Sequence, residues 1–273
     1  MAQGSADALA MFAGPLAVII GLVFLTPLGS LFSGTSSVVA VVFIVATLLL
    51  QFVVVRRTTH HTVRTTQELH IRRKIQHAGS GVLVVVGSFF ASSLQVSIVL
   101  ACSAAAFYIV AQLRQQYKVV NSTYLRVFGP ILRQHEIAHR LPGAFWFLLG
   151  CCGSLLLFPK DVAQLSVLHL SLGDPCASLF GLTWGHHTSK LSNGKTIAGV
   201  VGCMFVCFVT SVGFLSVVDT SIQHLSGIQR VGVMALCGAA GTLGEVLYVG
   251  CDDNLSLPLV SGGVMSMVWR FIA

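Results

Sequence analysis

The sequence predicts an all-α protein, a polytopic transmembrane helix bundle. Of its 273 residues, 55% are hydrophobic and only 9% are charged, and the mean hydropathy is +0.85. A soluble domain of this size does not have such a composition, and apolar runs long enough to cross a bilayer recur along the chain. Since no internal repeat or low-complexity linker stands out, we expect a single integral membrane domain over residues 1–273.

Apolar runs define the predicted spans. A bilayer core of about 30 Å needs roughly 20 apolar residues per helix. We expect nine spans, with eight or ten as alternatives because the runs within 77–112 and 142–183 are barely interrupted. The predicted spans are 10–31, 38–56, 77–94, 95–112, 142–159, 161–183, 197–218, 228–249 and 256–271. The eight cysteines lie almost wholly in these apolar runs, so we interpret them as small core residues rather than disulfide partners or zinc ligands.

The basic residues of the loops predict the orientation. Loops 56–77, 113–141 and 185–196 carry 13 of the 16 lysines and arginines, and each loop follows an even-numbered span. The positive-inside rule therefore places these loops and the N-terminus in the cytosol. Eight of the ten histidines and the acidic run 252–254 fall on the same side.

The stretch 171–199 contains the strongest candidate for a site. Asp174 lies inside an apolar run, where a carboxylate is costly and therefore indicates function. On a helix, Asp174, Ser178 and Gly181 share one face. A polar segment follows, and Lys195 lies just before the next apolar segment, in Gly194-Lys195-Thr196. One acid, a small-residue face and this lysine would form a cradle for a metal-bound phosphate.

The same stretch also allows a purely structural interpretation. Ala177, Gly181 and Gly185 repeat at every fourth position and would let another backbone approach closely. Asp174 would then be a single satisfied acid on a helix-packing face. Spacing alone does not separate the two interpretations.

A cationic segment leads into the third predicted span. Arg73 and His77 lie one helical turn apart, and Lys74 is adjacent to Arg73. These side chains could grip nucleotide phosphates. The alternative is the ordinary basic collar of a membrane helix.

The eighth predicted span and the loop after it contain further acids. Glu245 lies in apolar surroundings, and Asp252 would share its face if the helix continued that far. Asp252, Asp253 and Asn254 offer oxygen ligands of the kind that magnesium prefers. The alternative here is a solvated acidic loop.

Two short motifs match patterns known from zinc hydrolases and from P-loop nucleotide-binding proteins, but we expect neither activity here. Residues 135–139, His-Glu-Ile-Ala-His, match the zinc-hydrolase pattern, but Pro142 follows closely and no third ligand offers itself in that loop. We keep Glu136 as a candidate site residue, because it is a cytosolic acid close in sequence to Arg133. Gly194-Lys195-Thr196 ends like a phosphate-binding P-loop, but Ser189 occupies the position of the required first glycine, so we reject a Walker-type nucleotide fold.

Taken together, these motifs resemble the signature of the CTP-dependent lipid kinases, the superfamily of dolichol kinase, phytol kinase and fungal-type diacylglycerol kinase, with the CDP-diacylglycerol synthases as distant relatives. The resemblance covers roughly residues 70–260. It is carried by Arg73-Lys74-x-x-His77, by Leu125-Arg126 through Glu136 to Gly143-Ala144-Phe145-Trp146-Phe147-Leu148-Leu149-Gly150, by Phe158-Pro159-Lys160-Asp161-Val162-Ala163, by Gly173-Asp174-x-x-Ala177-Ser178-x-x-Gly181-x-x-x-Gly185, by Gly194-Lys195-Thr196-x-x-Gly199, and by Glu245 and Asp253-Asn254-Leu255-x-x-Pro258. The stretch 145–170 and the ending 194–199 look most like the diacylglycerol kinase branch.

The resemblance implies transfer of the γ-phosphate of CTP to diacylglycerol, giving phosphatidate, with Mg²⁺ or another divalent cation as cofactor. The expected site consists of catalytic Asp174 and Lys195; phosphate-binding Arg73, Lys74, His77, Lys195 and Thr196; metal-binding Asp174, Asp253 and Asn254; and supporting Glu136, Glu245, Ser178, Gly181 and Asp252. The nucleotide and the lipid class rest on the resemblance, whereas phosphate chemistry is also supported by the residue types.

Three other functions stay open from the sequence. A prenol or dolichol kinase would differ only in its lipid groove, and a CDP-diacylglycerol synthase would release pyrophosphate instead of CDP. A transporter could use Asp174 and Glu245 as ion sites within the membrane. For the favoured function we expect a membrane lipid and CTP as partners, no nucleic acid, and a location in the endoplasmic reticulum or nuclear envelope with the active site in the cytosol.

Overall fold

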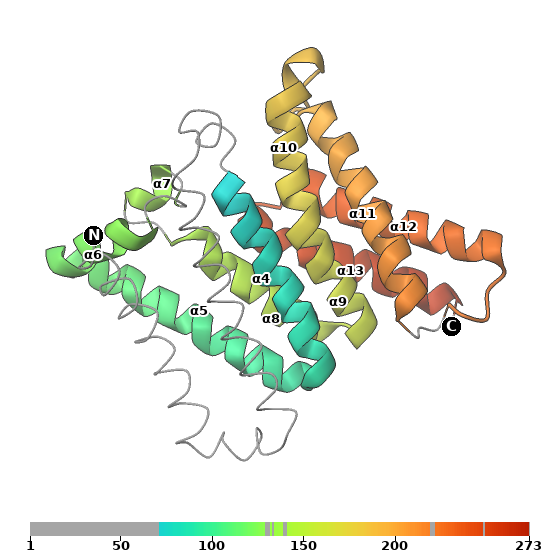
Figure 1. Cartoon of the computed structure of the whole chain (residues 1–273), viewed down its shortest axis with the longest axis horizontal. Coiled ribbons are helices and arrows are strands. Elements are labelled where there is room, and N and C mark those ends of the chain that lie inside the picture. The colour runs from blue at the N-terminus through green and yellow to red at the C-terminus, as the bar shows by residue number, and fades with distance from the viewer. Residues whose placement is uncertain are drawn as a thin grey trace.

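The computed structural model describes residues 71–128, 132, 134–138, 141–218, 222–247 and 249–272, and this part of the chain is all-α. The elements are α4 (Ile71–Phe90), α5 (Ser93–Gln116), α6 (Lys118–Phe128), α7 (Gln134–Ile137), α8 (Gly143–Leu157), α9 (Lys160–Leu168), the π-helical turn η4 (His169–Gly173), α10 (Asp174–Trp184), the 3₁₀ turn η5 (Gly185–His187), α11 (Ile197–Val217), α12 (Gly227–Val246) and α13 (Asp253–Ile272). In Figure 1, α9, η4 and α10 run end to end as one long rod, with α4 on one side and α11 on the other.

The helices confirm seven of the nine predicted spans as helical segments, within a few residues at each end. Within the described residues, four helical stretches are long and apolar enough to cross a membrane: Ser93–Gln116, Lys160–His187, Ile197–Val217 and Asp253–Ile272. Helix α8 is apolar but shorter. The protein is therefore a multi-pass membrane protein. The predicted spans 10–31 and 38–56 lie outside the described residues, so the count of nine stays a prediction.

Prolines mark the start of two helices and the irregular turn before a third. Pro142 and Pro159 occupy the N-cap positions of α8 and α9. Pro175 follows η4 and cannot donate an N–H to the carbonyl of Ser171, four residues earlier. The hydrogen-bond ladder widens to a π-turn just before this proline, and π-turns change the direction in which the following side chains point. Asp174, at the first position of α10, is the residue that this turn aims.

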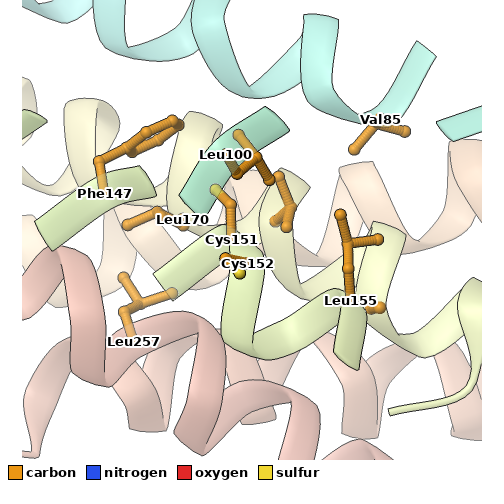
Figure 2. Packing of buried hydrophobic residues seen from close by; sticks show 10 residues of the cluster. Val85, Leu100, Phe147, Cys151, Cys152, Leu155, Leu170 and Leu257 are labelled. Carbon is orange, nitrogen blue, oxygen red and sulfur yellow. The ribbon is translucent and has the colours of Figure 1, made fainter. Parts of the chain in front are cut away.

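Two clusters of buried apolar side chains form the core. One joins α4, α5, α8, α9, η4 and α13 through residues such as Phe147, Leu170 and Leu257 (Figure 2). The other lies among α9, α11, α12 and α13 and includes Leu165 and Met265. All eight cysteines lie in the described part of the chain and are free thiols, five of them buried, which confirms the prediction that they are not disulfide partners.

Close helix contacts at glycine tie this core to the residues around Asn254. A Cβ added at Gly150 of α8 would lie 2.3 Å from the backbone oxygen of Asn254 at the start of α13. A Cβ at Gly87 of α4 would meet nothing within 4 Å. The chain therefore offers a matched pair of glycines, one in close contact and one in open space.

We expect Gly150→Ala to lower the free energy of unfolding by about 1–3 kcal/mol, because overpacking against backbone forces α8 and α13 apart. Gly87→Ala is the control and should be neutral or stabilising, since alanine is the better helix former. Thermal unfolding of the detergent-solubilised protein measures both. A Gly150→Ala protein as stable as the wild type would contradict the contact.

Candidate active site

Asp174 lies beside the first turns of α4. The Nε2 atom of His77 is 3.6 Å from Oδ2 of Asp174 and 3.2 Å from the carbonyl oxygen of Leu170. The side chains of His77 and Asp174 are 11% and 21% exposed, so both are largely shielded but still reachable. Ser178, predicted to share the face of Asp174, is exposed. The structure thus joins two residues that are separated by nearly a hundred positions in the sequence.

Lys74 extends this contact. Its charge interacts with those of Asp174 and Arg73. Burial lowers the pKa of Lys74, Asp174 opposes that shift, and the neighbouring positive charge of Arg73 adds to it. The cationic segment predicted from the sequence therefore does reach the acid of α10.

Lys195 lies between two acids from the end of α12 and the start of α13. Its Nζ atom is 3.0 Å from Oε1 of Glu245 and 3.1 Å from Oδ2 of Asp253, and it also donates to the backbone carbonyl of Glu245. Burial would lower the pKa of Lys195, but the two carboxylates raise it above its ordinary value. Lys195 therefore carries a full positive charge at neutral pH.

A tight loop holds Lys195 in this position. Gly194 adopts φ +85°, a left-handed conformation that favours glycine, and Lys190 pairs with Thr196 in an antiparallel bridge. The side chain of Asn193 donates to the carbonyl of Val246 at 2.8 Å and accepts from the Lys195 amide at 3.1 Å. The loop is thereby anchored to the end of α12, and Lys195 is directed at Glu245.

The small-residue face of α10 packs against α11. Cβ atoms added at Gly181 and Gly185 would lie within about 3 Å of the Thr196 side chain, and one at Gly199 would lie 2.7 Å from the carbonyl of Ala177. Thr196 caps α11, because its hydroxyl accepts from the Gly199 amide at 3.2 Å. The small residues of this face therefore do allow close packing, whereas the role of Asp174 and phosphate binding by Thr196 stay predictions.

The two acid–cation pairs belong to one cluster. The charge of Glu245 interacts with those of Asp174, Lys195 and Asp253. Three carboxylates, those of Asp174, Glu245 and Asp253, thus interact with one another and with nearby cations. The second carboxylate oxygen of Glu245 is buried and has no hydrogen-bond partner among the described residues.

The condition for one sequence prediction at this cluster is not met. Glu245 and Asp252 do not share a helical face, because α12 ends at Val246 and the chain turns through Gly250, which has φ +81°. Asp252 instead accepts from the amide of Asn254 at 3.0 Å, at the start of α13. The turn, not a continuous helix, brings Asp253 to Lys195.

A second polar cluster surrounds Gly143 at the start of α8. Oε1 of the buried Glu136 accepts from the Gly143 amide at 2.7 Å, and Nδ2 of the buried Asn254 donates to its carbonyl at 3.3 Å. A Cβ added at Gly143 would also lie 3.9 Å from a guanidinium nitrogen of Arg73. Glu136, Asn254 and Arg73 therefore converge on one small residue.

These residues line a cavity of about 110 Å³ that sequence reasoning missed. Its wall also includes Gln76 and His77, together with aromatic side chains such as Tyr124. Gln76 directly precedes His77 in the basic segment, but nothing in the spacing of the aromatic residues indicates a cavity.

The acidic residues of this site indicate which kind of metal ion it could hold. Within the described ranges, no group of three His, Cys, Asp or Glu residues is arranged to hold a metal ion. For the zinc-hydrolase pattern, α7 ends at Ile137, as expected, and Glu136 is engaged by Gly143. His139 and the side chain of His135 lie outside the described part. Magnesium is commonly held by one or two carboxylates plus substrate phosphates, so this cluster of acids suits it better than zinc.

Comparison with known proteins identifies the family. The chain is 31% identical over 164 residues to CTP-dependent diacylglycerol kinase 1 of Schizosaccharomyces pombe, covering 57% of this chain and 73% of that protein. The chain belongs to the CTP-dependent diacylglycerol kinase family. Members of this family in Eremothecium gossypii and Saccharomyces cerevisiae are 28% and 29% identical over 172 and 175 residues, covering 58% and 59% of this chain.

The family relationship does not extend over the whole length of these relatives. The matched regions cover 73%, 54% and 60% of the three proteins. No family model matches the chain, and no solved structure matches it.

Proposed function

We propose that this protein is a lipid kinase that transfers the γ-phosphate of CTP to diacylglycerol and forms phosphatidate. The observation that carries the proposal is that Glu245, which contacts Lys195 beside Asp253, also interacts electrostatically with Asp174, in a member of a CTP-dependent lipid kinase family. Phosphoryl transfer depends on positioning and on charge stabilisation more than on covalent catalysis. Fixed acids and cations on several helices meet that requirement.

In the proposed reaction, the lipid hydroxyl oxygen attacks the γ-phosphorus of CTP. The bond between this phosphorus and the oxygen that bridges to the β-phosphate breaks, and CDP leaves. The hydroxyl proton passes to Asp174, which His77 holds in place. Lys195 and Lys74 bind the phosphate oxygens, with Arg73 at the edge of the cluster. In the nucleotide-bound protein, Lys195 would exchange part of its contact with Glu245 and Asp253 for phosphate.

The acids fit a divalent cation bound together with the nucleotide. The buried oxygen of Glu245, which has no hydrogen-bond partner among the described residues, supports this assignment. Asp174 and Asp253 would hold Mg²⁺, whereas the side-chain nitrogen of Asn254, the third predicted ligand, donates to the carbonyl of Gly143. The ion would neutralise charge on the transferred phosphoryl group.

The lipid acceptor and the cellular location are part of the same proposal. A lipid hydroxyl lies near the membrane surface, which is where the ends of α12 and the starts of α4 and α13 would present their charged groups. The basic loops favour a cytosolic site in the endoplasmic reticulum or nuclear envelope membrane. They would also attract the nucleotide and retain an anionic product.

Purified protein supplied with Mg²⁺ and CTP tests the acceptor. Diacylglycerol, dolichol and phytol are offered in parallel in mixed micelles, with ATP replacing CTP in a second series. We expect phosphatidate and CDP from diacylglycerol with CTP, and at least a tenfold lower rate with ATP. Preferential phosphorylation of dolichol or phytol would instead assign a prenol kinase.

A further inference from the structure

The cavity beside Gly143 is enclosed by aromatic walls on one side and polar groups on the other. Phe107, Tyr124 and Phe128 form one wall, with ring centroids 4.8 Å apart for Tyr124–Phe128 and 6.2 Å apart for Phe107–Phe128. Tyr124 is 3% exposed, and the guanidinium of Arg114 lies 4.0 Å above its ring. These contacts hold the buried Tyr124 ring in place, and the partly exposed rings of Phe107 and Phe128 are the ones on which a flat ligand could stack.

The volume of the cavity limits the size of that ligand. The cavity measures about 110 Å³ and is partly open. An engineered protein cavity of about 150 Å³ holds benzene, so this space is tight for one six-membered ring and too small for a fused two-ring system. Size alone therefore favours a pyrimidine over a purine.

The polar side of the cavity carries complementary hydrogen-bonding groups. Glu136 presents a buried carboxylate whose orientation is fixed by the Gly143 amide at 2.7 Å. Arg73 and Gln76 line the same space and supply N–H donors. A cytosine ring has an exocyclic amine that donates at one position and a carbonyl and a ring nitrogen that accept beside it, which matches this arrangement.

The cavity also lies next to the acid–cation cluster. His77 lines it and contacts Asp174, and Asn254 lines it and directly follows Asp253, the partner of Lys195. A ligand with its ring in the cavity could therefore extend its phosphates between Asp174 and Lys195.

We infer that this cavity is the cytosine-binding pocket, in which the carboxylate of Glu136 accepts from the exocyclic amine and thereby selects cytosine over uracil. The inference rests on the proposed function, which supplies the nucleotide. Stacking on the aromatic wall would hold any base, because every base has a flat face. Discrimination then falls to Glu136, since uracil presents a carbonyl oxygen where cytosine presents the amine.

Glu136→Gln tests this assignment. Glutamine keeps an oxygen for the Gly143 amide, so the fold should be retained, and its amide can donate to the uracil carbonyl. We expect the ratio of kcat/KM for CTP to that for UTP to fall by about 10- to 100-fold. The matched control is Asp161→Asn, because Asp161 accepts from Trp269 Nε1 at 3.0 Å and does not line the cavity; its ratio should stay at the wild-type value.

A binding measurement makes the test independent of turnover. The free buried cysteines become reactive on unfolding, so a thiol-reactive dye reports the unfolding temperature of the solubilised protein. CDP should stabilise the wild type more than UDP does, and Glu136→Gln should remove or reverse that difference.

Each outcome separates this inference from the proposed function. If Glu136→Gln keeps the wild-type CTP/UTP ratio while the wild type still makes phosphatidate from CTP, the pocket assignment is wrong and the kinase assignment stands. A changed KM for diacylglycerol with an unchanged nucleotide ratio would show that the cavity takes the acceptor lipid instead. A wild-type protein that transfers no phosphate from CTP would overturn the proposed function itself.

Discussion

Asp174→Asn is expected to reduce phosphoryl transfer by at least about 10³-fold while the protein remains in the membrane fraction. Asparagine keeps the size of the side chain but removes the charge that pairs with His77 and Lys74. It also removes the proton acceptor and one proposed ligand of Mg²⁺. The measurement is the initial rate of phosphatidate formation at saturating CTP and diacylglycerol.

The result separates a catalytic acid from a packing residue. If Asp174 only satisfies a helix-packing face, Asp174→Asn should lower the unfolding temperature and leave the rate per folded molecule close to that of the wild type. Asp161→Asn serves again as the control, because it removes an acid that contacts Trp269 rather than this cluster. Its rate should match the wild type.

Lys195→Met is expected to lower both activity and stability. The substitution leaves Glu245, whose side chain is 8% exposed, without its cationic partner, while Asp253 is 37% exposed and can be solvated. Removing one partner of a buried ion pair costs about 3 kcal/mol or more. Phosphoryl transfer should fall by at least about 10²-fold, because a phosphate ligand is lost.

A double substitution distinguishes the two effects. Lys195→Met combined with Glu245→Gln removes the unpaired buried charge, so we expect most of the lost stability to return while activity stays absent. Thermal unfolding and rate measurements on the two single variants and the double variant complete the cycle. Wild-type turnover by Lys195→Met would remove Lys195 from the site.

Much of the fold follows from the sequence, because apolar runs must be helical in a bilayer. The runs 197–218 and 256–271 became α11 and α13 almost residue for residue. Asp174 and Lys195 could also be singled out, since a charge beside or within an apolar run is costly unless it has a function or a partner.

The partners of these charges could not be predicted. Lys195 contacts Glu245 and Asp253, which are 50 and 58 positions away, and the packing of α11 against α12 and of α12 against α13 brings them together. The end of α12 was predicted to within three residues, but the turn through Gly250 that places Asp253 beside Lys195 could not be read from composition. The cavity depends on residues from six helices and leaves no periodic pattern in the sequence.

The central claim is that this cluster of acids and cations transfers the terminal phosphate of CTP to a lipid. Two parallel reactions of the purified protein with diacylglycerol test it most directly, one with CTP labelled at the γ-phosphate and one with CTP labelled at the α-phosphate. We predict that the lipid acquires the γ-label alone, that the α-label stays in the CDP released, and that Asp174→Asn abolishes the transfer. Recovery of the α-label in the lipid, with release of pyrophosphate, would contradict the account and assign a nucleotidyl transfer instead.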